Sequence, residues 1–158
     1  MADSSFFPIY EEASNLDLPI CIHIGLGSQT YLNLFEFEVS RSFATHFVQM
    51  EVAFKNLVDG KVPERFPNLR WGFFECAASW VPWVLHFWKN SERKKSIREA
   101  RDRGEEITKL EKVAGADDWG PKLFQNSKIY IACEVDEDIT YLVNYIGEDN
   151  LLVGSDYA

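Results

Sequence analysis

Four short apolar runs constrain the fold of this chain more than any other feature of its sequence. They occupy residues 18–24, 69–74, 129–133 and 151–153, and longer segments with helical patterns separate them. Near-continuous hydrophobicity over so few residues is typical of strands covered on both faces, as in a parallel sheet. Parallel strands need crossover connections, which helices usually supply. The sequence therefore predicts an α/β fold with right-handed crossovers, in the order β, α, β, αα, β, α, β.

The segments between the runs carry several helix signals. Residues 42–57 place Phe and Met side chains at helical spacing, and Gly60 marks the end of that helix. An aromatic group at residues 80–88 has helix-like spacing and is predicted to pack in the core, and the charge-dense stretch 91–113 continues the helical pattern. Residues 139–146 carry an apolar stripe, with acidic capping residues before it and a glycine after it.

Length and charge limit the class of protein. The chain has 158 residues, a formal net charge of −9 and 46% hydrophobic residues, the profile of a single globular unit over residues 1–158. Nucleic acids and acidic membranes require clustered Lys and Arg, so we expect neither as a partner. The longest apolar run, around residues 80–88, is far shorter than the roughly 20 residues of a spanning helix. Residues 1–20 lack the pattern of a signal peptide, which predicts a cytoplasmic protein.

Ionisable side chains stand where each apolar run ends. His23 lies at the end of the first run, Glu75 and Glu134 follow the second and third, and Asp156 follows the fourth. In parallel α/β folds, reactive side chains gather at the C-terminal ends of the strands. Imidazole and carboxylate groups that converge there suit zinc or a similar divalent ion, which lowers the pKa of bound water. Asp156 could also act as a proton shuttle.

Strand alternation predicts what lies beneath these polar groups, because residues two apart point the same way. Cys21 is expected beneath His23, and Phe73 beneath Glu75. This arrangement would place a small or apolar layer below a polar opening.

Other patterns offer weaker alternatives. The segment 25–27 resembles the start of a dinucleotide-binding loop, but Thr30 stands where the third glycine belongs. His46 and His86 lie in helical segments among aromatic residues, which favours packing or surface positions.

The three cysteines, Cys21, Cys76 and Cys133, are expected to be buried, reduced thiols. Together with His23 they could form a closed zinc site, although their spacing matches no zinc knuckle or ribbon.

Three segments together resemble a known enzyme family. The chain is similar, in order and spacing, to the C-terminal half of the amidohydrolase-related metal-dependent hydrolases through LPICIHIG, RFPNLRWGFFECAASWVPWVL and IYIACEVDEDITYLVNYIGEDNLLVGSDYA. This group includes aminocarboxymuconate-semialdehyde decarboxylase-like and resorcylate decarboxylase-like enzymes. The resemblance runs from about Phe7 onward. It implies a partial TIM (β/α)8 barrel with about four βα units that correspond to strands five to eight.

The resemblance also implies roles for three residues. His23 resembles the metal-ligand histidine at the end of strand five, and Asp156 the strand-eight aspartate that binds metal and handles the proton. Glu75 stands where many members have the strand-six histidine, and it could accept a proton, contact the metal or orient water. The resemblance thus implies that Glu75 and Asp156 are catalytic, and that His23 and Asp156 bind a divalent ion, Zn²⁺ or Mn²⁺.

One part of the family pattern is missing from the chain. The strand-one His-x-His pair, which supplies two metal ligands in relatives, has no counterpart in the sequence, and neither do strands one to four. We therefore expect either a piece of a longer protein or a half-barrel that pairs with a second copy, with weak metal affinity alone. Unpaired strand edges and an apolar interior favour such association.

Two hypotheses follow. The leading one is a segment of a metal-dependent amidohydrolase-like enzyme that hydrolyses, or decarboxylates without oxidation, a small carboxylate substrate such as an aromatic one. The alternative is a catalytically inactive half-barrel that acts as a binding or assembly module, with the mixed-charge helix around residues 93–112 as its contact surface.

Overall fold

One sheet of four parallel strands forms the centre of the fold. The computed structural model describes residues 1–25, 27, 29–34, 36–37, 43–105 and 119–154. The strands lie in the spatial order β1 (Ile20–His23), β2 (Trp71–Phe74), β3 (Ile129–Cys133) and β4 (Leu151–Val153). Each strand pairs in parallel with the next. Each strand lies within one of the four apolar runs, and the predicted α/β class is confirmed.

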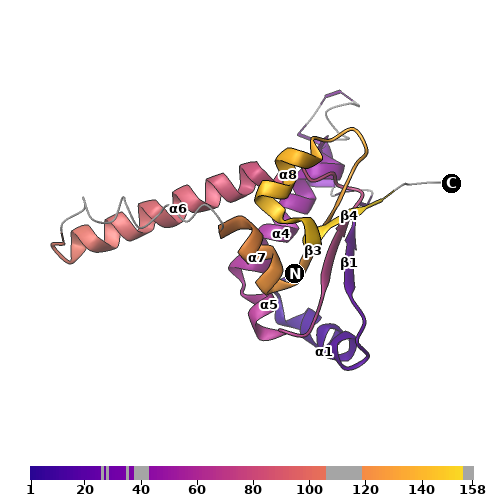
Figure 1. Ribbon diagram of the computed structural model, residues 1–158, viewed down its shortest axis with the longest axis horizontal. Helices are drawn as coiled ribbons and strands as arrows, with labels where there is room; N and C mark the ends of the chain where they lie inside the picture. The colour runs from indigo at the N-terminus through magenta and orange to yellow at the C-terminus, as the bar shows by residue number, and fades with distance from the viewer. Residues whose placement is uncertain (26, 28, 35, 38–42, 106–118, 155–158) are drawn as a thin grey trace.

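Helices occupy the segments before and between the strands (Figure 1). Before β1 lie η1 (Ser4–Phe6) and α1 (Phe7–Asn15). Between β1 and β2 lie α2 (Gln29–Leu32), the π-helix η2 (Ala44–Val48), α4 (Gln49–Asp59) and α5 (Val62–Arg65). Between β2 and β3 lie α6 (Val81–Asp102) and α7 (Trp119–Ser127). Between β3 and β4 lie α8 (Ile139–Ile146) and the 3₁₀ turn η4 (Glu148–Asn150).

The ends of α8 follow from local side-chain and backbone chemistry. The Asp138 carboxylate accepts a hydrogen bond from the backbone N–H of Tyr141 at 2.9 Å, which satisfies one of the free donors of the first turn. Gly147 ends the helix with a φ of +89°, a conformation that favours glycine. The predicted start and stop of this helix are confirmed. The charge-dense stretch 91–113 is helical as far as Asp102, and its residues 106–113 lie outside the described residues.

The two faces of the sheet have different surroundings. Helices α4, α7 and α8 gather on one side (Figure 1), where Phe73 and Ile131 are fully buried and the strand register aligns them with Ile22. The opposite face carries Cys21 and His23, which are both exposed. In the part of the chain that the structure describes, the prediction of cover on both faces is thus wrong for β1. On the inner strands, Gly72 of β2 and Ala132 of β3 are buried on this same face.

Aromatic side chains fill the core between the sheet and its helices. Phe54 of α4 is fully buried, and its ring centroid lies 5.8 Å from that of Phe73 on β2. The ring of Phe124 on α7 stacks on it at 5.8 Å, and that of Trp80 lies 5.3 Å away. Phe54 therefore joins strand β2 and the connections before and after it in one cluster. Each well-placed aromatic pair contributes roughly 0.5–1.5 kcal/mol beyond area burial.

Helix α6 projects from the body of the molecule (Figure 1). Val81, Val84 and Leu85 in its first turns are buried, whereas Trp83 and Phe87 are 62% and 55% exposed. Core packing, predicted for the whole aromatic group at residues 80–88, is therefore wrong for these two. None of the described helices combines the length and the hydropathy that crossing a bilayer requires.

Replacement of Phe54 by alanine tests the role of this aromatic cluster. We expect Phe54→Ala to lower the free energy of unfolding by about 3–5 kcal/mol, because it leaves a cavity between three rings. Urea denaturation followed by circular dichroism measures the change. Val52→Ala, at a 42% exposed position of the same helix, is the matched control and should change stability by no more than about 0.5 kcal/mol. Equal losses in the two variants would contradict the placement of Phe54.

Candidate functional site

A cavity of about 690 Å³ opens where the strands end. Parallel pairing brings the carboxyl ends of all four strands to the same edge of the sheet, which is why their following residues meet there. The ionisable residues that line the cavity are His23, His46, Glu75, Cys133, Glu134 and Asp136, and Gly154, which follows β4, lines it as well. Three of the four ionisable residues predicted at the strand ends, His23, Glu75 and Glu134, therefore line this cavity. The fourth, Asp156, lies outside the described residues.

His23 and Glu75 are in direct contact within this cavity. The His23 Nε2 atom lies 2.9 Å from Oε2 of Glu75, and the two side chains are 60% and 38% exposed. An ion pair with this exposure adds only about 0–1 kcal/mol to stability. The contact therefore contributes little to the free energy of folding. Its interest is that the two groups together can bind a proton or a cation.

The hydrogen bond of the other ring nitrogen, Nδ1, restricts the ways in which His23 can bind Glu75. Nδ1 lies 2.9 Å from the carbonyl oxygen of Ile24, to which it donates its proton. A hydrogen bond between Nε2 and Glu75 then requires one more proton, either on the ring or on the carboxyl group. In the neutral ring, Nε2 and Oε2 present lone pairs to each other, and a cation can satisfy both. An N–H donated to a backbone carbonyl is also the usual support of a metal-binding histidine.

Glu75 reaches His23 because the backbone turns sharply after β2. The strand ends at Phe74, and Glu75 has a φ of +55°, in the left-handed region. The register sets Phe74 beside His23, while Phe73 pairs with Ile22 on the helix-covered face. The prediction that Phe73 lies beneath Glu75 is therefore wrong, because strand alternation stops one residue before Glu75. Cys21 and His23 do share a face, as predicted.

The left-handed conformation of Glu75 has an energetic cost. For a residue other than glycine it is roughly 1–2 kcal/mol. Ala77, two residues further on, has a φ of +50° and adds a second strained position. Strained residues cluster at sites where surrounding contacts hold them for a purpose. Here the strain turns the Glu75 carboxylate back toward His23.

His46 also lines the cavity, a position that the sequence did not indicate. Its neighbours Phe43 and Phe47 suggested packing, and its ring does lie 6.4 Å from that of Phe47. It belongs to the π-helix η2, a form often found at functional sites. Only the fold brings η2 beside the ends of β1 and β2, so no local spacing could have identified His46.

The donor groups of the cavity fit a divalent ion in part. Imidazole nitrogen and carboxylate oxygen are typical ligands of Zn²⁺, and His23 and Glu75 hold one of each in contact. Within the described ranges, however, no group of three or more His, Cys, Asp or Glu side chains is arranged to hold a metal ion. The closed zinc site of Cys21, His23, Cys76 and Cys133 is therefore excluded.

The cysteines differ in their surroundings. Cys76 and Cys133 are buried as predicted, whereas Cys21 is exposed on the open face of the sheet, so the prediction is wrong for Cys21. Burial raises the pKa of the Cys76 thiol to about 12. Burial also raises the pKa of Cys133, whose thiol donates to the carbonyl oxygen of Leu152 at 3.2 Å. The two buried thiols thus stay protonated at neutral pH.

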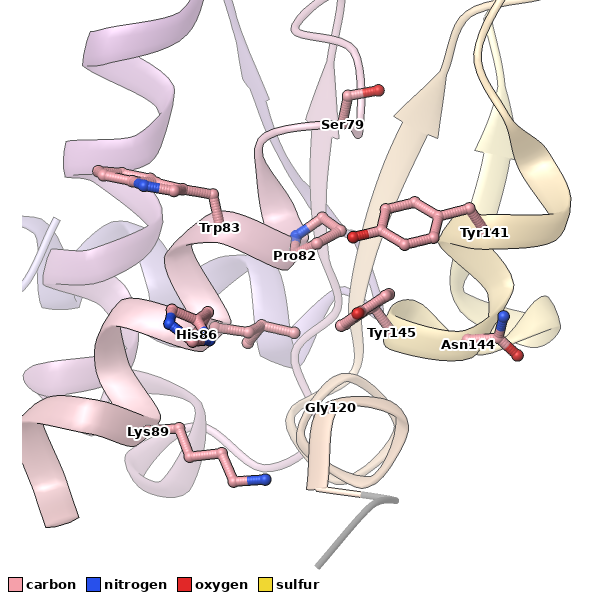
Figure 2. Close-up of a pocket in the computed structure, with 10 residues that line it drawn as sticks. Ser79, Pro82, Trp83, His86, Lys89, Gly120, Tyr141, Asn144 and Tyr145 are labelled. Atoms are coloured by element: carbon pink, nitrogen blue, oxygen red, sulfur yellow. The ribbon is translucent and has the colours of Figure 1, made fainter. Parts of the chain in front are cut away.

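A second cavity, of about 710 Å³, lies on the helical side of the molecule. Figure 2 shows Trp83, His86 and Lys89 of α6 across from Tyr141 and Tyr145 of α8. His86 and Trp83, one of the two exposed aromatic residues of α6, thus line this second cavity. It stands apart from the strand ends, and its lining includes none of the groups predicted there.

Comparisons with known proteins identify the fold. Protein-family models give no match to the chain, and neither do curated proteins. The structure is similar to the crystal structure of an amidohydrolase from Mycobacterium avium subsp. paratuberculosis, with a TM-score of 0.67 and 18% sequence identity. The match covers 99% of this chain and 37% of that chain, so the chain spans little more than a third of its neighbour's length. The predicted partial amidohydrolase barrel is confirmed as a fold.

The surroundings of the cysteines predict selective modification. We expect iodoacetamide at pH 8 to alkylate Cys21 at least about tenfold faster than Cys76, because the thiolate is the reactive form and burial disfavours it. Peptide mass spectrometry over time measures the rates. In denaturant all three cysteines should react alike. Equal rates for Cys21 and Cys76 in the folded protein would contradict the burial of Cys76.

Proposed function

We propose that this chain supplies the half of a metal-dependent amidohydrolase-like site that corresponds to barrel strands five to eight. The observation that supports the proposal best is the contact of His23 with Glu75 at the ends of parallel strands, over a cavity large enough for a small substrate. The similarity of the fold to an amidohydrolase supports it as well. The reaction that we propose is hydrolysis, or non-oxidative decarboxylation, of a small carboxylate such as an aromatic one.

In this proposal, His23 and Asp156 hold a divalent ion, Zn²⁺ or Mn²⁺. Such an ion lowers the pKa of bound water toward neutrality and polarises oxygen atoms of a substrate. The hydrogen bond from Nδ1 of His23 to Ile24 fixes the ring so that Nε2 faces the cavity. Because the described residues hold too few ligands for a complete site, we expect weak affinity from this chain alone.

Glu75 and Asp156 are the proposed acid–base groups. The Glu75 carboxylate lies within hydrogen-bond distance of His23, so it can hold a proton between the two groups or pass one into the cavity. Asp156 follows the end of β4, and in the proposal it exchanges a proton with the substrate or with water.

The site is completed by other chain segments in this proposal, either the strands of a missing barrel half or a second copy of this chain. The open face of the sheet supports this, since Cys21 is exposed and helices α4, α7 and α8 gather on the opposite side (Figure 1). At the β4 edge, Val153 is 80% exposed. Uncovered apolar faces and strand edges bind other chains readily.

A projecting α6 supports the second candidate function, an inactive binding or assembly module. Its distal half carries Lys94, Lys95 and Arg98, and it extends away from the sheet (Figure 1). In that case the strand-end cavity would bind no metal, which the following experiment distinguishes.

Zinc binding tests the proposed ligands. We expect His23→Ala and Asp156→Ala each to weaken Zn²⁺ binding by roughly tenfold or more, because each removes a ligand. Competition with a chromophoric chelator measures the affinity. His86→Ala, which removes an exposed histidine of α6, is the matched control and should leave the affinity unchanged. The same affinity in wild type and all three variants would exclude the proposed metal site.

Association tests the open face. We expect the 158-residue chain to self-associate at micromolar concentration, and Cys21→Asp to weaken this by placing a carboxylate on the open face. Sedimentation velocity measures the distribution of species. Val52→Asp, on the exposed side of α4, controls for the added charge. A wild-type chain that stays monomeric would contradict the proposed association.

A further inference from the structure

The carboxylate of Glu137 joins two loops at the rim of the strand-end cavity. Its Oε1 atom accepts from the backbone N–H of Ala78 at 2.9 Å and of Ser79 at 2.6 Å, and from the Ser79 hydroxyl at 2.5 Å. Its Oε2 atom accepts from the N–H of Ala78 at 3.0 Å and of Glu134 at 2.8 Å. The side chain is half-buried, and both of its oxygens are engaged.

These donors belong to two connections that are far apart in the sequence. Ala78 and Ser79 lie between Glu75 and the first turn of α6, and Glu134 is the first residue after β3. Glu75 and Glu134 both line the cavity. The bonds of one carboxylate thus set the spacing between the loop that carries Glu75 and the loop that carries Glu134.

The loop after β2 needs such support because it contains two strained residues. Glu75 and Ala77 have φ values of +55° and +50°. The indole N–H of Trp80 donates to the Ala77 carbonyl oxygen at 2.9 Å and holds one side of the loop. Glu137 holds the other side with charge-assisted bonds, which are roughly twice as strong as neutral ones. Its negative charge also faces the N-terminus of α6, where the helix dipole favours it.

Capping of α8 does not account for Glu137. Asp138 already performs that role through its bond to the N–H of Tyr141. The acidic run before α8 therefore contains two carboxylates with different tasks, one directed to its own helix and one to the neighbouring connection.

We propose that Glu137 is a positioning residue of the strand-end site. By holding the loop after β2 in its left-handed turn, it keeps the Glu75 carboxylate against Nε2 of His23. The inference rests on the proposed function in one respect: His23 and Glu75, the pair that Glu137 positions, are groups proposed to act in the strand-end site.

Nuclear magnetic resonance of the 158-residue chain tests this role. Glu137→Gln keeps the shape of the side chain but removes its charge and turns part of it into a donor. We expect the backbone amide signals of Ala78, Ser79 and Glu134 to move upfield. We also expect the imidazole ¹⁵N signals of His23 to move toward the values found in Glu75→Ala, which has no side-chain group to pair with Nε2 and is the reference for a broken pair.

Two further variants separate positioning from general stabilisation. Asp138→Ala removes the cap of α8 and should lower stability without moving the His23 signals. Ser79→Ala removes only the hydroxyl donor, and it should move the His23 signals in the same direction as Glu137→Gln but less far. It also keeps the proposal testable where Glu137→Gln fails to fold.

Two results would overturn the proposal. Unchanged amide signals in Glu137→Gln would show that the bonds are absent. Changed amide signals with wild-type His23 signals would show that Glu137 joins the loops without positioning Glu75.

The zinc affinity separates this inference from the proposed function. We expect Glu137→Gln to weaken Zn²⁺ binding by roughly tenfold, because it displaces Glu75, the group in contact with the proposed metal ligand His23. Unchanged affinity in Glu137→Gln, with weaker binding in Glu75→Gln, would also overturn the positioning role. If neither Glu75→Gln nor His23→Ala changes the affinity for Zn²⁺, the proposed metal site is wrong. In that case the imidazole ¹⁵N signals of His23 in the metal-free chain still decide whether Glu137 positions Glu75.

Discussion

Parallel pairing of four consecutive strands is the constraint on which the rest of this structure depends. Because all four strands run the same way, every connection must return across the sheet, and the residues after each strand end at one edge. The helices that make these returns lie together and bury one face around Phe54. The candidate site is a consequence of the same geometry, since His23, Glu75 and Glu134 stand at the ends of three different strands and line one cavity there.

The strand-end site shows a local conflict that tertiary contacts resolve. An extended Glu75 would continue the alternation of β2, whereas the left-handed turn brings its carboxylate to His23 at a cost of about 1–2 kcal/mol. The exposed contact with His23 returns too little to balance that cost. The loop is instead held by Trp80 and Glu137, whose bonds reach across it from both sides. Trp80 and Glu137 thus stabilise the loop, whereas His23 and Glu75 are the groups proposed to act on a substrate.

The open face of the sheet accounts for several features that a closed domain would lack. Cys21 is exposed although it lies in a strand, and the β4 edge leaves Val153 uncovered. The amidohydrolase with the same fold is more than twice as long, since this chain covers 37% of it. The open face of the sheet therefore resembles half of a barrel interior more closely than a surface adapted to solvent. Among the described residues, no group of three or more potential metal ligands lies together.

Strand positions, the α/β class and the ends of α8 could be predicted from the sequence, because they depend on apolar runs and capping residues that act over a few neighbours. The grouping of His23 with Glu75 also followed, since parallel order alone brings strand ends together. Three features could not be predicted. The direction in which the Glu75 side chain turns depends on the left-handed backbone conformation of that residue. The position of His46 at the cavity depends on the packing of η2. The hydrogen bonds of Glu137 depend on donors that include Ser79, 58 residues away in the chain. Each of these is a contact between segments that only the tertiary structure brings together, so no local pattern in the sequence specifies it.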